Sequence, residues 1–362
     1  MQAFELRFTG DLSTSAGLFT HDYYAELLTD APNIRYDFLH DQQPKANDPT
    51  YQDRLYAMEI KPHHVAGANA IVVCRPYVTA AAFAHGADSL VAMARAGIGY
   101  DKIDLAACTA NDVVVFNTPH GMTHSTASAA MFFILALSKR FPMQQRIVRE
   151  HRWDLQREAI GDDLAGLTLG IVGLGRTGFE LVRLLAPFHM RVIAYSPHAD
   201  PVKAKEAEIE LLGSLDAVLK EADYVSLHGR LDDRTRGMLG NRELSLMKPS
   251  AFFINVARGE MVDEHALFLL LRDRRIAGAG LDVFETEPLP KSSPLLTLDN
   301  VLLTPHYLCS THQSGRASAD SLIRGVLSVA KGALPENILN PEVISRPGFR
   351  KKLGRFHPAS NV

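Results

Sequence analysis

Short apolar segments alternate with helix-length segments along most of the chain. Eleven of them have the length and composition of β-strands: FELRF, IRYDFL, AIVVC, LVAMA and DVVVFN in the first third, then LTLGIV, RVIAY, YVSLH, AFFINV, AGAGLDV and NVLLT. The later segments are apolar at consecutive positions, as strands covered on both faces are. Strands separated by helices indicate βαβ units and parallel sheets. Since eleven strands exceed one ordinary sheet, the pattern predicts an α/β fold with two sheets.

Two breaks in this pattern indicate where one domain gives way to the other. The first is the turn NTPHG, Asn117 to Gly121, followed by the apolar run AAMFFILAL, which is too short to span a bilayer and is expected to be a wholly buried helix. The second lies near His306, where the strands end and helical sequence begins. We expect one domain from residues 1–116 and 307–345, a second from residues 117–306, and a solvated basic tail over residues 346–362.

Composition excludes several classes of partner. The net charge is −3, from 38 basic and 41 acidic residues, which indicates neither a nucleic acid nor an acidic membrane surface. The three cysteines, Cys74, Cys108 and Cys309, fit neither a zinc site nor a disulfide framework, so a reducing cytoplasm and no metal are expected. The first ten residues, MQAFELRFTG, lack the features of a secretory signal.

The stretch TLGIVGLGRTGFELVRLLA combines a strand, a Gly-x-Gly-x-x-Gly turn and an amphipathic helix. Gly173 permits the tight turn, Gly175 lets a pyrophosphate approach the backbone, and Gly178 allows the helix to pack on the strand. The first amides of the helix then face the anion. Because the glycines lie in this strand–turn–helix context, a dinucleotide site is favoured over a merely structural turn.

The residue that reads the ribose is expected at the end of the next strand, RVIAY. NAD sites have an acid at this place, whereas this chain has Ser196, which can hydrogen bond but carries no charge. The nearest cationic candidates are His198, Lys203 and Lys205, and both lysines are expected on a solvent-facing helix surface. The pattern predicts weak discrimination between the cofactors, with a preference for NAD over NADP.

Four reactive side chains follow the later strands. AFFINVARG ends in Arg258, GLDVFETEP carries Asp282 and Glu287, and NVLLTPH ends in His306. Each alone could be a surface arginine, a solvated carboxylate or a core histidine. At one edge of a parallel sheet, however, arginine can bind a carboxylate, histidine can donate a proton, and a neighbouring carboxylate favours a protonated histidine. The set indicates hydride transfer to a 2-oxo acid.

These motifs resemble the D-2-hydroxyacid dehydrogenase family, which includes phosphoglycerate dehydrogenase and hydroxypyruvate reductase. The matching stretches cover most of Leu90 to Val343: ARAGIGYDKIDLAA, VVVFNTPHG, GLTLGIVGLGRTG, LKEADYVSLH, LMKPSAFFINVARG, GAGLDVFETEP, NVLLTPH and LPENILNPEV. The resemblance implies two Rossmann-like domains. Residues 117–306 would be the doubly wound domain that binds NAD(P), and the smaller, flavodoxin-like domain would bind the substrate.

The resemblance also implies residue roles. Arg258 would bind the substrate, and His306 would be the proton donor with Glu287 as its partner. The implied cofactor contacts, besides the three glycines, are Arg176, Thr177, Ser196, Val256, Ala257 and Asp282. The loop from Cys74 to Thr79, which includes Arg75, Pro76 and Tyr77, would lend backbone amides to the substrate carboxylate. Gly99, outside this loop, would do the same. A homodimer through the nucleotide domain is implied, and Trp153, the only tryptophan, suits its interface.

Some positions depart from the family pattern. Tyr307, Leu308 and Cys309 stand where the family has Ile-Gly-Gly after its histidine, which adds bulk beside the nicotinamide. Ser128 replaces an acid at the start of the long helix, and Met122 replaces an asparagine.

These departures leave other functions to weigh against the dehydrogenase. A dinucleotide-sensing corepressor on the same fold is the main alternative. A formate or phosphite oxidising relative is disfavoured by Glu287, since formate enzymes of this fold carry glutamine there. Cys309 as a nucleophile is disfavoured because no second base is evident.

Overall fold

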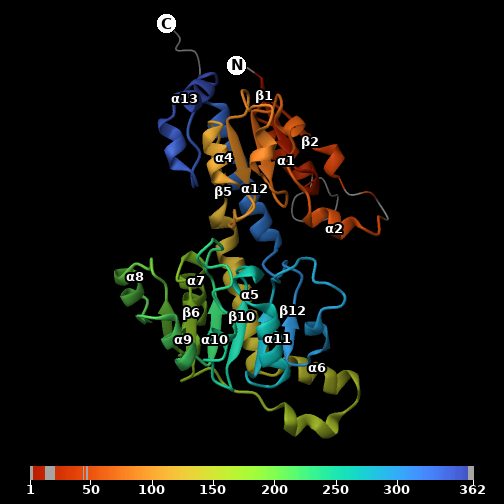
Figure 1. Cartoon of the computed structure of the whole chain (residues 1–362), viewed down its shortest axis with the longest axis vertical. Helices are drawn as coiled ribbons and strands as arrows, with labels where there is room; N and C mark the ends of the chain where they lie inside the picture. Colours follow the sequence, from red (N-terminus) through yellow and green to blue (C-terminus); the bar gives the residue numbers. More distant parts are fainter. Residues whose placement is uncertain (1–2, 13–20, 44, 46–47, 358–362) are drawn as a thin grey trace. The chain divides into compact units, whose positions relative to one another are not determined.

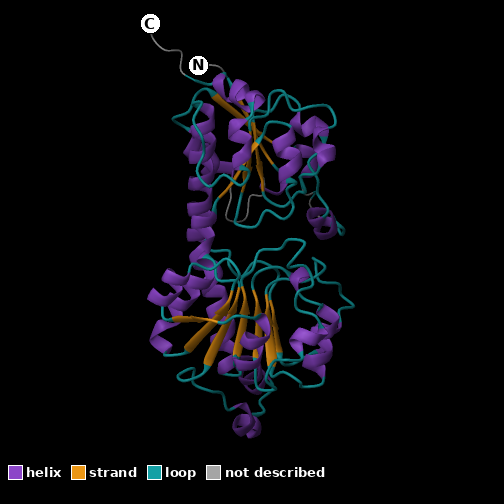
Figure 2. Ribbon diagram, turned by 60° about the vertical axis from the view of Figure 1, so that its left-hand side comes forward, coloured by secondary structure: helices purple, strands orange, loops and turns teal. Residues whose placement is uncertain are grey.

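A computed structural model of the chain describes residues 3–12, 21–43, 45 and 48–357. The chain forms two compact units: unit 1 comprises Met1–Met122 with Ser310–Val362, and unit 2 comprises Thr123–Cys309. Each unit contains one parallel sheet, drawn in orange in Figure 2. The first division falls within helix α5 (Pro119–Ser138), six residues after the expected boundary, and the second falls three residues after the expected one.

Unit 1 is built on a five-stranded sheet with the order β2-β1-β3-β4-β5. This is the flavodoxin-like order, as expected. Its strands are β1 (Phe4–Phe8), β2 (Ile34–Phe38), β3 (Ala70–Val73), β4 (Ala92–Arg95) and β5 (Val114–Asn117). Its helices of the α type are α1 (His21–Leu28), α2 (Tyr51–Tyr56), α3 (Pro62–Val65), α4 (Leu105–Ala110), α12 (His312–Ala330) and α13 (Pro347–Gly354).

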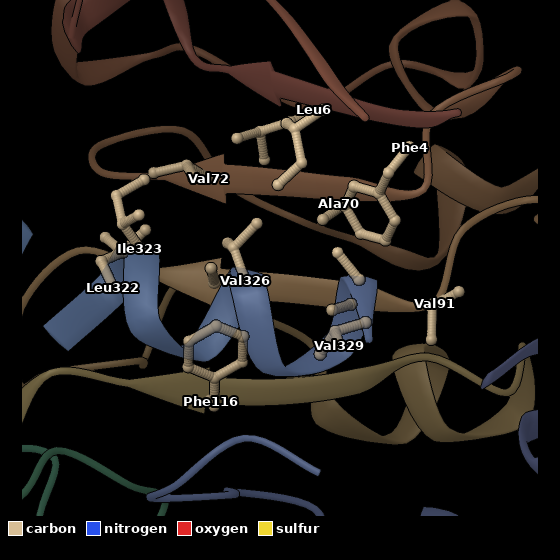
Figure 3. Close-up of a cluster of buried hydrophobic side chains, with 14 of the residues drawn as sticks. Phe4, Leu6, Ala70, Val72, Val91, Phe116, Leu322, Ile323, Val326 and Val329 are labelled. Atoms are coloured by element: carbon tan, nitrogen blue, oxygen red, sulfur yellow. The ribbon is translucent and has the colours of Figure 1, made fainter. Parts of the chain in front are cut away.

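Both faces of this sheet are buried. Along β3, Ala70 and Val72 join one apolar cluster, whereas Ile71 and Val73 join another, as the two-residue period of a strand requires. Helix α12 covers the first face through side chains that meet Phe116 and other strand residues (Figure 3). A Cβ at Gly325 of this helix would lie 2.3 Å from the Phe116 ring, so glycine permits the close approach.

Unit 2 is built on a seven-stranded sheet with the order β12-β11-β10-β9-β6-β7-β8. This is the doubly wound order of a dinucleotide-binding domain extended by one strand. Its strands are β6 (Thr168–Val172), β7 (Arg191–Tyr195), β8 (Ile209–Leu211), β9 (Tyr224–Leu227), β10 (Phe252–Asn255), β11 (Gly278–Leu281) and β12 (Val301–Leu303). Its α-helices are α6 (Phe141–Arg149), α7 (Arg176–Leu185), α8 (Pro201–Glu206), α9 (Leu215–Glu221), α10 (Asn241–Leu244) and α11 (Glu264–Arg272). Strand β8 was not predicted, because Glu206, Glu208 and Glu210 interrupt the apolar residues of this segment.

The apolar run of α5 packs against this sheet. Phe133 is fully buried, and a Cβ at Gly280 of β11 would lie 2.5 Å from its ring. The expectation of a wholly buried helix is wrong, since Phe132 is 44% exposed. No helix in the described ranges combines the length and hydropathy that crossing a lipid bilayer requires.

The expected solvated tail is wrong for its described part, residues 346–357. Helix α13 places Phe349 and Leu353 in the core of unit 1, and Phe356 follows them. The ammonium group of Lys352 is buried and donates to the carbonyl oxygens of Leu90, at 3.1 Å, and Asn111, at 2.6 Å. The apolar residues recur on one helical face, so the helix is amphipathic despite its basic composition.

Burial lowers the pKa of Lys352 to about 8. An unfolded lysine titrates at about 10.4, so between about pH 8 and about pH 10 the unfolded chain binds the additional proton, and the contribution of Lys352 to stability rises with pH. The free energy of unfolding of wild type minus that of Lys352→Met, measured by urea denaturation, should therefore increase across this window. The exposed neighbour Lys351 serves as control, because Lys351→Met should leave the pH dependence unchanged. Parallel wild-type and Lys352→Met curves would contradict the burial argument.

Candidate active site

The carboxyl edge of the unit 2 sheet gathers the predicted functional residues. In parallel sheets ligands bind beyond this edge, at the point where the strand order reverses, which here lies between β6 and β9. Six strands deliver side chains or turns to it: Gly173 follows β6, Ser196 follows β7, His228 follows β9, Val256 to Arg258 follow β10, Asp282 follows β11 and His306 lies three residues after β12.

The glycine turn between β6 and α7 has the shape that a pyrophosphate requires. Gly173 has a φ of +91°, and a Cβ there would lie 2.6 Å from the backbone nitrogen of Gly229. A Cβ at Gly178 would press on Ile171 at 3.3 Å, whereas one at Gly175 would meet nothing within 4 Å. The open side at Gly175 and the first amides of α7 therefore fit a dinucleotide.

The residues around Ser196 give no strong cationic site for a 2′-phosphate. Ser196 is half-buried after β7, and His198, Lys203 and Lys205 are exposed. Lys203 lies 3.8 Å from Asp200, with which it forms an ion pair. The position of Ser196 agrees with the predicted place of a ribose-reading residue, and its role stays a prediction.

The imidazole of His306 is hydrogen bonded to the carboxylate of Glu287. Its Nδ1 lies 2.8 Å from Oε2 and 3.1 Å from Oε1 of Glu287. Since a carboxylate only accepts, Nδ1 donates and Nε2 is left for another partner. Burial alone would raise the pKa of Glu287, but the bond to His306, the N–H of Phe284 and the charge of Arg258 together lower it. Glu287 therefore ionises more readily than an ordinary glutamate and places a negative charge beside the imidazole.

The backbone around His306 is held in an unusual conformation. His306 has a φ of 51°, which costs conformational energy in a residue other than glycine. Asp282 stabilises this loop, because its Oδ1 accepts from the Thr304 hydroxyl at 2.5 Å and from the amides of Tyr307 at 3.1 Å and Leu308 at 3.2 Å. Asp282 is therefore an anchor of the loop, which the sequence did not reveal, and its contact with the cofactor stays a prediction.

The turn that carries Arg258 is fixed by Asn255. The Asn255 side chain accepts from the amide of Ala257 and donates to the carbonyl of Arg258, both at 3.0 Å. A Cβ at Gly259 would lie 1.8 Å from the carbonyl carbon of Phe284, so glycine brings this turn against the segment that leads to Glu287. Asn255 was missed, although a polar residue closing the apolar strand FFIN was a usable signal.

His228 is a second residue that the sequence analysis missed. Its Nε2 lies 2.8 Å from the hydroxyl of buried Ser226. Burial lowers the pKa of His228 to about 4, so the ring is neutral near pH 7. It follows β9 beside Gly173, and it can therefore offer a neutral donor or acceptor next to the glycine turn.

Cys309 has the properties of a thiol rather than a thiolate. Burial raises its pKa, and the charge of Asp282 raises it further. The thiolate is the nucleophilic form of cysteine, so this environment disfavours Cys309 as a nucleophile.

In unit 1 the loop after β3 uses most of its backbone amides internally. The amides of Cys74, Arg75, Tyr77 and Val78 already donate within the unit, to Thr9, Asp11, Met58 and Lys102 respectively. Pro76 has no N–H group. These four amides are therefore already paired within the unit, and the contact of this loop with a substrate stays a prediction. Gly99 lies in the turn after β4, where its carbonyl oxygen accepts a hydrogen bond from Arg95 at 2.6 Å. The contact of its amide with the substrate carboxylate stays a prediction.

Comparison with known proteins identifies the family. The family model described as D-isomer specific 2-hydroxyacid dehydrogenase, NAD binding domain, matches residues 131–307. A glyoxylate reductase of Korarchaeum cryptofilum is 38% identical over 271 residues, which is 74% of this chain and 81% of the relative. A D-3-phosphoglycerate dehydrogenase of Methanocaldococcus jannaschii is 37% identical over 75% of this chain, which spans only 51% of that relative.

A solved structure agrees with the sequence relatives. D-lactate dehydrogenase from Aquifex aeolicus, complexed with NAD and lactic acid, superimposes with a TM-score of 0.78 at 26% identity, covering 92% of this chain and 99% of that one. Sequence, sheet order and strand-edge residues agree in pointing to one group of proteins. The chain belongs to the D-isomer specific 2-hydroxyacid dehydrogenase family.

Proposed function

We propose that this protein is an NAD(P)-dependent oxidoreductase that interconverts a small 2-oxo acid and a D-2-hydroxy acid. The observation that carries the proposal is the contact of Nδ1 of His306 with both oxygens of Glu287. This pair follows the same sheet edge as a glycine turn shaped for a dinucleotide. Relatives named as glyoxylate reductase, D-3-phosphoglycerate dehydrogenase and D-lactate dehydrogenase support the class of reaction.

Each residue of the site has a separate task in reduction. The nicotinamide cofactor, when bound, supplies the hydride to C2 of the oxo acid. Arg258 binds the substrate carboxylate through its planar guanidinium. His306 donates the proton on Nε2 to the C2 oxygen as that oxygen gains negative charge, and it is left as a neutral imidazole. Glu287 keeps the proton on Nδ1 and so fixes which nitrogen reacts.

A panel of 2-oxo acids tests the proposal directly. Glyoxylate, hydroxypyruvate, pyruvate and phenylpyruvate are incubated with NADH or NADPH, and loss of the reduced-nicotinamide absorbance is followed. At least one acid should be reduced to the D-2-hydroxy acid. Failure of all four with both cofactors, in protein shown to be folded, would overturn the proposed activity for this class of small acids.

The alternatives are weaker. The relatives named above are enzymes, so they lend no support to a corepressor. Glu287 contrasts with the glutamine of formate enzymes and favours the 2-oxo acid. A cytoplasmic location without nucleic-acid partners remains a prediction from composition.

We also propose a homodimer formed by unit 2. Five large apolar side chains between residues 132 and 160 are exposed: Phe132, Phe141, Val148, Trp153 and Ile160. They belong to α5, to α6 and to the segment after it, so exposed apolar side chains are concentrated in one stretch of the chain, which suits a protein interface.

Replacement of His306 by alanine tests its role as proton donor. General acid–base catalysis contributes about a hundred- to ten-thousand-fold, so kcat of His306→Ala should fall by that factor. Binding of NADH, measured by fluorescence titration, should survive. Near-normal turnover would show that His306 is only a structural residue.

Gly259→Ala tests the contact between the Arg258 turn and the Glu287 segment. The additional methyl group meets backbone atoms of Phe284, so the turn must move, at a cost of about 1–3 kcal/mol in unfolding free energy. Activity should fall as Arg258 shifts. Gly213→Ala is the control, since a Cβ at Gly213 meets nothing within 4 Å. Equal stability of the two variants in thermal unfolding would contradict the predicted clash.

Ser196→Asp tests which residue reads the ribose. A carboxylate at this position binds the ribose hydroxyls and repels a 2′-phosphate, so NADH activity should be kept or improved. NADPH activity should fall about tenfold or more, which corresponds to about 1.4 kcal/mol. An unchanged ratio of kcat/KM for NADH and NADPH would reject Ser196 as the discriminating position.

Trp153→Glu tests the dimer. Trp153 is 55% exposed, and a charge in place of a central aromatic residue should weaken an interface through unit 2. Light scattering at micromolar concentration should report a dimer for wild type and a smaller mass for the variant. Val202→Glu, at an exposed position on α8, should remain dimeric. A monomeric wild type would reject the proposal.

A further inference from the structure

Unit 2 carries an arginine, Arg230, beside the glycine turn, on the loop that follows β9. The backbone of Gly229 closes against Gly173, because a Cβ at Gly173 would lie 2.6 Å from the Gly229 nitrogen and 2.7 Å from its Cα. The amide of His228 donates to the carbonyl of Val172 at 2.8 Å, which joins the start of this loop to the end of β6. Arg230 is the next residue, so its side chain leaves the backbone directly beside the turn that is shaped for a pyrophosphate.

The loop that carries Arg230 is fixed by its own hydrogen bonds. The Thr235 hydroxyl donates to the carbonyl of Arg230 at 2.7 Å and accepts from the amide of Asp232 at 2.8 Å. Leu231, the next residue, is buried in the apolar core of unit 2. The backbone of Arg230 is therefore held between the core and a closed turn. The point from which its side chain extends is fixed before a ligand binds, which lowers the entropy cost of binding.

The Arg230 guanidinium contacts Asp232 at the surface. Its Nη2 lies 3.2 Å from Oδ2 of Asp232, and the two side chains are 59% and 38% exposed. An exposed pair of this kind contributes little to stability. The Asp232 carboxylate also accepts from the amides of Arg234 at 3.0 Å and Thr235 at 3.2 Å, so its main structural task is to cap the turn. Since a guanidinium carries five N–H donors, one that bonds to Asp232 can also donate to a phosphate.

The charges around the glycine turn favour an anion. Arg176 begins α7 directly after Gly175, and its side chain is exposed. The carboxylate of Glu180, one turn further along α7, is bonded to Arg183 and to His124, both at 2.7 Å. The negative charge of this helix is thereby balanced close to the turn. The first amides of α7 add the positive end of the helix dipole.

We propose that Arg230 binds the pyrophosphate of the nicotinamide cofactor, so that the loop after β9 contributes a cationic side chain beside the glycine turn. The proposal rests on the nicotinamide-dependent activity proposed above and adds a residue that recognises the cofactor. A guanidinium can form two parallel charge-assisted hydrogen bonds to a phosphate, which single backbone amides cannot. Because NAD and NADP both carry the pyrophosphate, Arg230 should strengthen the binding of both, whereas Ser196 is the position predicted to select between them.

Binding of the reduced cofactors tests the proposal without any substrate. Titration of wild type and Arg230→Gln with NADH and with NADPH, followed by nicotinamide fluorescence, gives a Kd for each cofactor. Both values should rise about tenfold in the variant, as the loss of a charge-assisted hydrogen bond predicts. A rise for NADPH alone would assign Arg230 to the 2′-phosphate and overturn the proposal. Unchanged values for both cofactors would overturn it as well.

Two further variants separate a direct contact from a general effect of charge. Arg234→Gln removes the same charge from an exposed side chain of the same loop, and it should leave both values of Kd nearly unchanged. Arg230→Lys keeps the charge but loses the planar fork, so its Kd should lie between those of wild type and Arg230→Gln. An equal rise in Kd for Arg234→Gln and Arg230→Gln would contradict a direct contact.

The outcomes separate this proposal from the proposed function. If folded wild type binds neither NADH nor NADPH, the proposed function fails and the assignment of Arg230 fails with it. If wild type binds a cofactor and Arg230→Gln binds it equally well, only the assignment fails. If Arg230→Gln does not fold, as judged by circular dichroism, Arg230→Lys decides, and a Kd equal to that of wild type rejects the assignment.

Discussion

Parallel strand pairing is the constraint on which the candidate site depends. Every strand pair in both sheets is parallel, so the carboxyl ends of neighbouring strands meet at one edge of each sheet. Arg258, Asp282 and His306 are separated by more than twenty residues in sequence, yet each follows one of three adjacent strands. Because strand ends determine the position of these side chains, a change in register would separate the histidine from its carboxylate.

Around this edge, buried polar groups stabilise a backbone that would otherwise relax. The positive φ of His306 is maintained by Asp282, which accepts three hydrogen bonds from the same loop. The Asn255 side chain fixes the turn of Arg258 through two hydrogen bonds to its backbone. Gly259, which has no side chain, lets that turn approach the segment that leads to Glu287. The imidazole is thus held on one side by its own loop and on the other by Glu287. Such rigidity suits a proton donor that must meet its acceptor in one geometry.

Much of this could be predicted from local sequence. Apolar runs predicted eleven of the twelve strands in the described part of the chain. The glycine turn and the strand-end residues were recognisable because each depends on a few neighbouring positions. Long-range contacts were not predictable in the same way. The amides after β3 are occupied because Thr9, Asp11, Met58 and Lys102 approach from other segments. The basic residues of α13 led to the prediction of a solvated tail, whereas the apolar residues of this helix pack in the core of unit 1.

The most direct test of the His306–Glu287 pair is the pH dependence of reductive kcat/KM for wild type and Glu287→Gln. Glutamine preserves an acceptor for the histidine ring but removes the charge that favours its protonated form. The pH above which reduction declines should therefore move down by about one unit or more in the variant. Superimposable profiles would contradict the account, because Glu287 would then have no influence on the group that donates the proton.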